Sequence, residues 1–381
     1  MFETEQERPL SKDWRERLRA IANPNERQRF VELLRRLRSL PADRARVAVE
    51  VSAALAMISL RASAEFLRAA PEAAQHLEAE ELRAWGEMGR RLAMSNHEAG
   101  QSFFAQGVAH LAELRSDARK LTFQICLRQM ALSSSIALST YRRTAALRQL
   151  VESDEELCGI LEVALEIARR SAKHSADFLD RAAKVAGRVD QFGESRHEIM
   201  REAIALAASL AARAGGIAAD FWALLPTGLD RLSFEEAHRL FRHTERMLEY
   251  GGAVALRAFA AGSELLRLAP ETFADWTSLL RIVGEHSSSS AIALARVGPE
   301  IARTILREHA AGPETLRRII AAARQVAQAD TEAAIACFRS APSALRSSTL
   351  EQFEAWAAEG LRREADAKAR RSYYALETRQ S

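Results

Sequence analysis

The sequence predicts an all-α fold, an α-solenoid of about nine helix-turn-helix repeats. The first observation is the stretch from Trp85 to Phe104, where one helix ends, a turn follows at Ser95, and a second helix begins with an aromatic pair. The second observation is that this pattern recurs at intervals of roughly 36 to 43 residues. The equivalent turn residues are Ser59, Ser95, Ser133, Ser171, Ala214, Gly251, Ser287, Asp330 and Asp366.

The third observation is a fixed apolar position on each side of the turn. Ten residues before the turn stand Val49, Trp85, Phe123, Leu161, Ile204, Phe241, Thr277, Ile320 and Trp356, of which only Thr277 is polar, with Trp276 beside it. Seven or eight residues after it stand Phe66, Phe103, Tyr141, Phe178, Phe221, Phe259, Leu294, Phe338 and Tyr373. Eight of these nine are aromatic, although aromatic residues make up only 6% of the chain. Such positions allow a two-helix unit to bury itself against its neighbours.

Residues 1–43 are predicted to form an N-terminal helical cap outside the repeat register, with helices near 12–22 and 26–39. Five arginines here could form a cationic face: Arg35, Arg36, Arg38, Arg44 and Arg46. This face is either a dock for an acidic partner or the solvated end of the array. The second interpretation is favoured because the end repeat of a solenoid needs a polar outer surface.

Residues 44–381 are predicted to be the helical-repeat solenoid, continuous with the cap, because no Gly/Ser-rich or Pro-rich linker interrupts them. Capping boxes predict the starts of four helices, at Ser153 with Glu156, Ser195 with Glu198, Ser233 with Glu236, and Thr349 with Gln352. Six prolines are expected at or between helix ends: Pro71, Pro226, Pro270, Pro299, Pro313 and Pro342. Strand signals are essentially absent. The expected architecture is therefore a superhelix of the HEAT or TPR type.

Bulk composition agrees with a soluble scaffold. The apolar fraction of 48% is enough for a core, and the formal charge is only +3. The three cysteines, Cys126, Cys158 and Cys337, are far apart in the sequence, which favours a reducing compartment and hence the cytoplasm. The N-terminus is too charged for a signal peptide, and Arg213 and Asp220 interrupt the most apolar stretch. No membrane span is expected.

A search for chemical motifs predicts neither a catalytic, cofactor-binding or metal-binding residue nor an identifiable partner-binding residue. His238 and His243 are five residues apart, so they diverge on a helix. The acidic run of Glu152, Asp154, Glu155 and Glu156 could bind a cation, but compensation of the helix dipole beside Ser153 explains it more simply.

The string from His286 to Ser290 could hold an anion or accept phosphate, but capping of a helix is the favoured interpretation. No glycine-rich phosphate loop, nucleophile elbow or Cys/His dyad is present. The sequence is therefore expected to encode no enzyme.

Trp85 with Gly89, Phe103 with Phe104, Trp356 with Gly360, and the closing residues Tyr373–Glu377 resemble the N-terminal helical-repeat region of the NorD/CbbO class of von Willebrand factor A proteins. The resemblance implies an adaptor for a MoxR-class AAA+ ATPase hexamer. It also implies a client, Rubisco for CbbO-like members or a nitric oxide reductase component for NorD-like members. In that family a von Willebrand A domain with a metal-dependent adhesion site follows the helical region. No DxSxS motif occurs here, so the metal site is not carried over. Either the chain is part of a longer protein or the domain has been lost.

The expected function is thus a non-enzymatic protein-binding scaffold, the N-terminal part of such an adaptor. Two alternatives remain: a stand-alone scaffold unrelated to an ATPase, and an RNA-binding solenoid. The small net charge and the unequal repeat lengths argue against the RNA-binding solenoid. No nucleic-acid partner is therefore expected.

Overall fold

The computed structural model describes residues 12–359, in which every regular element is a helix. The chain divides into two compact units, residues 1–183 and 184–381. Unit 1 contains α1 (Lys12–Ala20), α2 (Pro24–Arg36), α3 (Ala42–Ala56), α4 (Leu60–His76), α5 (Ala79–Ser95), α6 (His97–Ala105), α7 (Ser116–Gln129), α8 (Ser134–Arg148), α9 (Asp154–Ala168) and most of α10 (Ala172–Val189). The predicted all-α repeat fold is confirmed.

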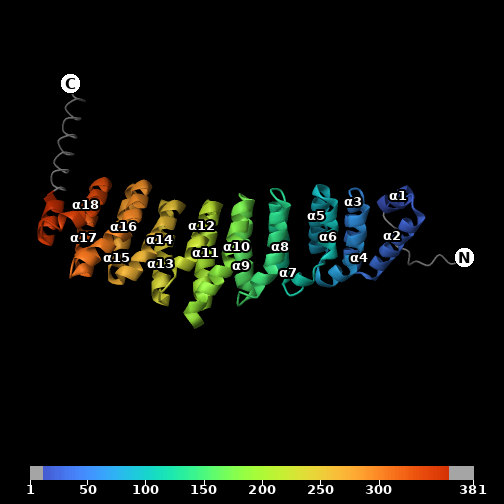
Figure 1. The fold of residues 1–381 in the computed structure, drawn as a ribbon, viewed down its shortest axis with the longest axis horizontal. Coiled ribbons are helices and arrows are strands. Elements are labelled where there is room, and N and C mark those ends of the chain that lie inside the picture. The colour runs from blue at the N-terminus through green and yellow to red at the C-terminus, as the bar shows by residue number, and fades with distance from the viewer. Residues whose placement is uncertain (1–11, 360–381) are drawn as a thin grey trace, which may run out of the picture. The chain divides into compact units, whose positions relative to one another are not determined.

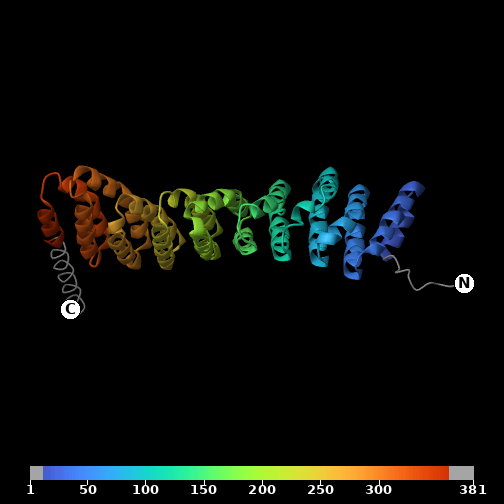
Figure 2. The same cartoon turned by 90° about the horizontal axis from the view of Figure 1, so that it is seen from below.

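Unit 2 begins within α10 and contains α11 (Arg196–Arg213), α12 (Gly215–Gly228), α13 (Phe234–Met247), α14 (Gly252–Leu268), α15 (Phe273–His286), α16 (Ser288–Glu308), α17 (Gly312–Ala327), α18 (Thr331–Ala344) and helical residues 350–359. Short 3₁₀ helices occupy Leu37–Ser39, Ala109–Leu111, Asp190–Ser195, Leu248–Tyr250 and Pro270–Thr272. Within each unit, consecutive helices stand side by side in chain order (Figure 1, Figure 2). None of the described helices is both long enough and apolar enough to cross a membrane.

The predicted turn residues are the N-caps of the second helix of each repeat. Ser59, Ser133 and Ser287 each accept a hydrogen bond from a backbone amide three residues on. In the second predicted repeat the cap is Asn96 rather than Ser95, and its side chain accepts from the amides of Glu98 and Ala99. Satisfying these free amides fixes where each second helix starts. Asp366 lies outside the described residues.

The aromatic position after each turn forms the core. All its described members are buried: Phe66, Phe103, Tyr141, Phe178, Phe221, Phe259, Leu294 and Phe338. The position before the turn is less uniform, because Val49 and Ile204 are only half-buried. Trp356 departs from the prediction, since it is 54% exposed and Phe353, one turn earlier, is buried instead. Tyr373 lies outside the described residues.

The repeat register begins earlier than the sequence pattern indicated. Asn23 caps α2 by accepting from the amides of Asn25 and Glu26, and it lies 36 residues before Ser59. Phe30, seven residues after Asn23, is buried like the later aromatics. The first described helix pair is therefore built as a repeat.

Four of the six prolines lie within the bounds of helices: Pro71 in α4, Pro226 in α12, Pro299 in α16 and Pro342 in α18. Pro226 and Pro342 stand in the last turn, as predicted, whereas Pro71 and Pro299 stand well before the end of the helix and depart from the prediction. Each stands twelve residues after its N-cap, so the proline is itself a repeated feature. Packing of a helix against its neighbours outweighs the lost amide at these positions. The prediction holds for Pro270 and Pro313, which lie in the first turn of their helices.

Two of the four predicted capping boxes are confirmed, because Ser233 with Glu236 and Thr349 with Gln352 exchange reciprocal hydrogen bonds. Ser153 accepts from the amide of Glu156, but the Glu156 carboxylate turns to the amide of Glu152. The prediction of a capping box at Ser195 is wrong. A 3₁₀ helix runs directly into α11 there, so Ser195 makes no capping hydrogen bond through its side chain.

Candidate functional site

Unit 1 presents a row of exposed apolar side chains along one edge. Met57, Met94 and Leu132 are 64%, 62% and 62% exposed. Each stands one or two residues before the N-cap of a second helix, in three consecutive repeats. We refer to these three residues as the apolar edge. These side chains are exposed because the first helix of each repeat ends beside them, so no further turn of that helix covers them.

The three turns lie beside one another. Ile58 and Ser59 line the same groove as Asn96 and His97, which places the first turn next to the second. The Arg91 guanidinium donates to the Leu127 carbonyl over 3.0 Å, which joins the end of α5 to the end of α7. Neighbouring packed helices lie about 8–10 Å apart, so the apolar edge extends over roughly 20 Å.

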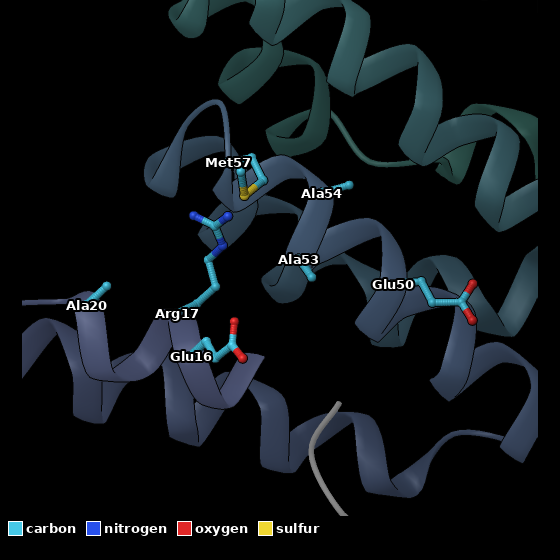
Figure 3. A pocket seen from close by; sticks show the side chains of 7 residues that line it. All are labelled: Glu16, Arg17, Ala20, Glu50, Ala53, Ala54 and Met57. Atoms are coloured by element: carbon cyan, nitrogen blue, oxygen red, sulfur yellow. The ribbon is translucent and has the colours of Figure 1, made fainter. Parts of the chain in front are cut away.

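A groove of 430 Å³ opens between α1 and α3 (Figure 3). Its apolar lining consists of Ala20, Ala53, Ala54 and Met57, and its polar lining of Glu16, Arg17 and Glu50. The guanidinium of Arg17 points toward Met57 (Figure 3). The groove thus offers an apolar floor with charged groups beside it, a combination that suits a protein side chain.

A second groove, of 540 Å³, lies on the other side of the same turn. Its lining comprises Ile58, Ser59, Arg61, Asn96, His97, Glu98 and Gln101. Ser59 and Asn96 already cap α4 and α6. The turn that carries Met57, Ile58 and Ser59 therefore borders both grooves.

Ion pairs organise the surface next to the apolar edge. Glu50 lies 2.9 Å from Arg83 of the next repeat, and Glu87 receives hydrogen bonds from both Arg90 and Arg91. The hydrogen bond from Arg90 is the main reason that the pKa of Glu87 is lowered. Arg90 also lies 3.5 Å from the sulfur of Met94. These carboxylates and arginines therefore neutralise one another within the chain.

Comparison of the chain with protein families, with curated proteins and with solved structures gave no match. Of the residues that carry the resemblance to the NorD/CbbO class, Trp85, Gly89, Phe103 and Phe104 lie in the core, whereas Trp356 is largely exposed. Trp85 and Phe104 pack edge to face at 5.0 Å, and Gly89 makes room for Phe104. Gly360 and Tyr373–Glu377 are outside the described residues.

The two histidines examined for metal spacing diverge as expected. His238 lies 2.6 Å from Glu202 of α11, while His243 faces the core and packs against Phe273. Burial, with a smaller contribution from Arg246, lowers the pKa of His243 to about 3. His243 is thus a neutral core residue, more deeply buried than a surface or core-edge position.

The acidic run at the start of α9 is used for local structure. Ser153 caps the helix, Asp154 lies 2.9 Å from Arg148, and Glu156 accepts from the amide of Glu152. Three residues of this region therefore make local contacts at the start of the helix.

The serine string also caps a helix. The Ser287 hydroxyl accepts from the Ser290 amide, and the Ser288 hydroxyl donates to the Tyr250 carbonyl of the preceding repeat over 2.7 Å. Two of the four hydroxyls therefore hold α16 in place.

The five arginines of the predicted cationic face fall into two groups. Three of its members are exposed and form no ion pair with a described residue: Arg35, Arg36 and Arg38. Arg44 donates to the Ala74 carbonyl at the end of α4, and Arg46 lies 3.9 Å from Glu50. Arg44 thus joins α3 to α4, whereas the Arg46–Glu50 pair lies within α3.

The apolar edge was missed by the sequence analysis, although a signal for it exists. A large apolar residue stands one or two positions before three consecutive turn residues, in the register already used to find the repeats. Periodicity finds residues that helices bury, and it does not distinguish them from residues that a turn exposes.

Proposed function

We propose that this chain is a non-enzymatic protein-binding scaffold and that the apolar edge of unit 1 is its docking surface. The observation that carries the proposal is the placement of Met57, Met94 and Leu132 at equivalent positions of consecutive repeats. Single exposed apolar residues are ordinary in soluble proteins, whereas an exposed apolar residue repeated at the turns of three consecutive repeats favours an interaction site. Two of the three are methionines, whose flexible side chains adapt to a partner's surface.

The finer proposal is that the chain forms the N-terminal part of an adaptor that links a MoxR-class AAA+ ATPase to a client protein. Its support is the resemblance at Trp85, Gly89, Phe103 and Phe104. The client is Rubisco or a nitric oxide reductase component, according to which member of the class the chain follows. We place the protein in the cytoplasm, where its three free cysteines remain reduced.

The test measures binding to a purified MoxR-class ATPase encoded beside this gene, with and without nucleotide. A triple variant, M57E/M94E/L132E, should weaken binding at least a hundredfold, since each glutamate places a charge on an apolar contact. The control is L150E/W356E, which alters two exposed apolar residues away from the apolar edge. Circular dichroism of each variant establishes that the helices are retained.

If the ATPase does not bind in any nucleotide state, the ATPase partnership is wrong. Equal loss of binding in the triple variant and in the control would instead remove the apolar edge as the docking surface. These two outcomes separate the identity of the partner from the location of the contact.

A further inference from the structure

The first helix pair has a higher net positive charge than the whole chain. Residues 14–39 contain eight arginines and three glutamates, a net charge of +5, whereas the whole chain has a net charge of +3. The arginines are Arg15, Arg17, Arg19, Arg27, Arg29, Arg35, Arg36 and Arg38. The charge is therefore concentrated at one end of unit 1.

Most of these arginines form no ion pair among residues 12–359, which the structure describes. Five are exposed and form no ion pair with a residue that the structure describes: Arg19, Arg29, Arg35, Arg36 and Arg38. Arg27 is used to hold the turn before α2, because it donates to the Ile21 carbonyl. In the next two repeats the arrangement differs, since Arg83, Arg90 and Arg91 all pair with glutamates.

The same end of unit 1 borders the groove between α1 and α3. Helix α1 forms one wall of this groove through Glu16, Arg17 and Ala20, and Met57 lies on the opposite wall. A side chain that enters the groove therefore lies against the most basic helix pair of the chain (Figure 3).

We propose that the segment docked at the apolar edge is an acidic stretch of a partner protein. It places a large apolar side chain in the groove beside Met57 and directs its carboxylates to Arg17, which lines the groove, and to the exposed Arg19 on the same helix. This inference rests on the proposed function and names the chemical class of its partner. Guanidinium groups suit the role because their planar fork binds a carboxylate through two hydrogen bonds.

The groove favours protein over the other polyanions. Its floor is made of three alanines and Met57, which suit an aliphatic or aromatic side chain rather than a phosphate backbone. Single-stranded nucleic acid is held largely by exposed aromatic rings, yet the exposed large apolar residues described in unit 1 are methionine and leucine.

The test uses synthetic peptides and does not require the natural partner. The probe is a fluorescein-labelled helical peptide of twenty residues with leucine on one face and glutamate on the other. One twin replaces every glutamate with lysine, and a second replaces every leucine with alanine. Fluorescence anisotropy at low and high salt should show at least tenfold tighter binding of the Glu/Leu peptide than of either twin. That binding should weaken as salt rises.

Matched variants locate the contact. R17E/R19E should weaken binding of the Glu/Leu peptide at least tenfold, whereas R257E/R339E, which changes two exposed arginines of unit 2, should leave it unchanged. M57Q should also weaken it, whereas L150Q should not. These substitutions lie on exposed or groove-lining positions, so the fold is expected to be retained.

Three outcomes would overturn the inference. Preference for the Lys/Leu twin, still lost in M57Q, would refute the acidic class while leaving the docking surface in place. Equal or tighter binding of a single-stranded oligonucleotide, or of vesicles of anionic phospholipid, would show that the basic end recognises phosphate. Binding of the Glu/Leu peptide that is unaffected by both M57Q and R17E/R19E would show that the peptide docks elsewhere.

Discussion

Phe104 of α6 fills the space that a side chain at Gly89 of α5 would need. A methyl group at Gly89 would lie 1.9 Å from the Cζ atom of the Phe104 ring. Trp85, one turn earlier on α5, packs edge to face against the same ring at 5.0 Å. The two helices of this repeat approach closely because one of them has no side chain at the point of contact.

Gly89→Ala is therefore expected to destabilise the protein. The added methyl group must displace Phe104 from a packed core, at a cost of about 1–3 kcal/mol in the free energy of unfolding. Urea denaturation followed by circular dichroism measures this loss. Gly187→Ala is the control, because that glycine is exposed on α10 with nothing within 4 Å of the added atom. Alanine there should leave stability unchanged or raise it by up to about 1 kcal/mol. Equal stability of the two variants would mean that the Phe104 ring can adopt another position without loss of packing.

A second prediction concerns Glu81, which joins two neighbouring repeats. Its buried carboxylate accepts from the amide of Glu78, the hydroxyl of Ser116 and the guanidinium of Arg119. Glu81→Gln removes the charge and leaves Arg119, which is largely buried, without its counter-ion. We expect a loss of about 1.5–3 kcal/mol in the free energy of unfolding.

The control for Glu81 is its neighbour. Glu80→Gln alters an exposed carboxylate on the same helix and should change stability by less than about 0.5 kcal/mol. If the two variants are equally stable in the same urea titration, the contact between α5 and α7 does not depend on this ion pair.

The repeats could be predicted because each unit needs the same buried positions. Phe66 and Phe178 are buried for the same reason, so a fixed distance from the turn residue located both. The prolines show the limit of this reasoning. Pro71 and Pro299 suggested helix ends, but the surrounding repeats supply enough packing to continue each helix through a residue that weakens it.

The candidate site could be predicted only in part. The excess of arginine near the N-terminus is visible in composition, whereas the groove beside Met57 exists only once α1 lies against α3. Arg44 and Arg35 look alike in sequence, yet Arg44 binds the Ala74 carbonyl and Arg35 remains exposed. Whether an arginine binds a group of a neighbouring helix depends on distances in the folded protein, and the local sequence pattern does not contain these distances.

A third prediction uses tryptophan emission. Of the five tryptophans, Trp14, Trp85, Trp222 and Trp276 are fully buried, and Trp356 is 54% exposed. Acrylamide should quench one component of the native fluorescence readily, and Trp356→Phe should remove that component while the remaining emission shifts to shorter wavelength. Trp276→Phe serves as the comparison and should leave the quenchable component intact. If the native protein shows no readily quenched component, Trp356 is shielded from solvent.

The last prediction concerns the pH dependence of stability and follows from His243. Burial against Phe273 lowers the pKa of this imidazole from 6.5 to about 3, so the folded protein keeps it neutral. Between these two values the unfolded chain binds a proton at this residue that the folded protein does not. The free energy of unfolding must therefore fall as the pH falls below 6.5, by up to about 1.4 kcal/mol for each pH unit.

His243→Leu should flatten this pH dependence of stability between pH 6 and pH 4 in urea titrations. His174→Leu is the control, because that side chain stays in water after folding, and its pH dependence should match that of the native protein. A native protein whose stability does not decrease over this range, or a His243→Leu variant with an unchanged slope, would show that the imidazole accepts a proton without leaving the core.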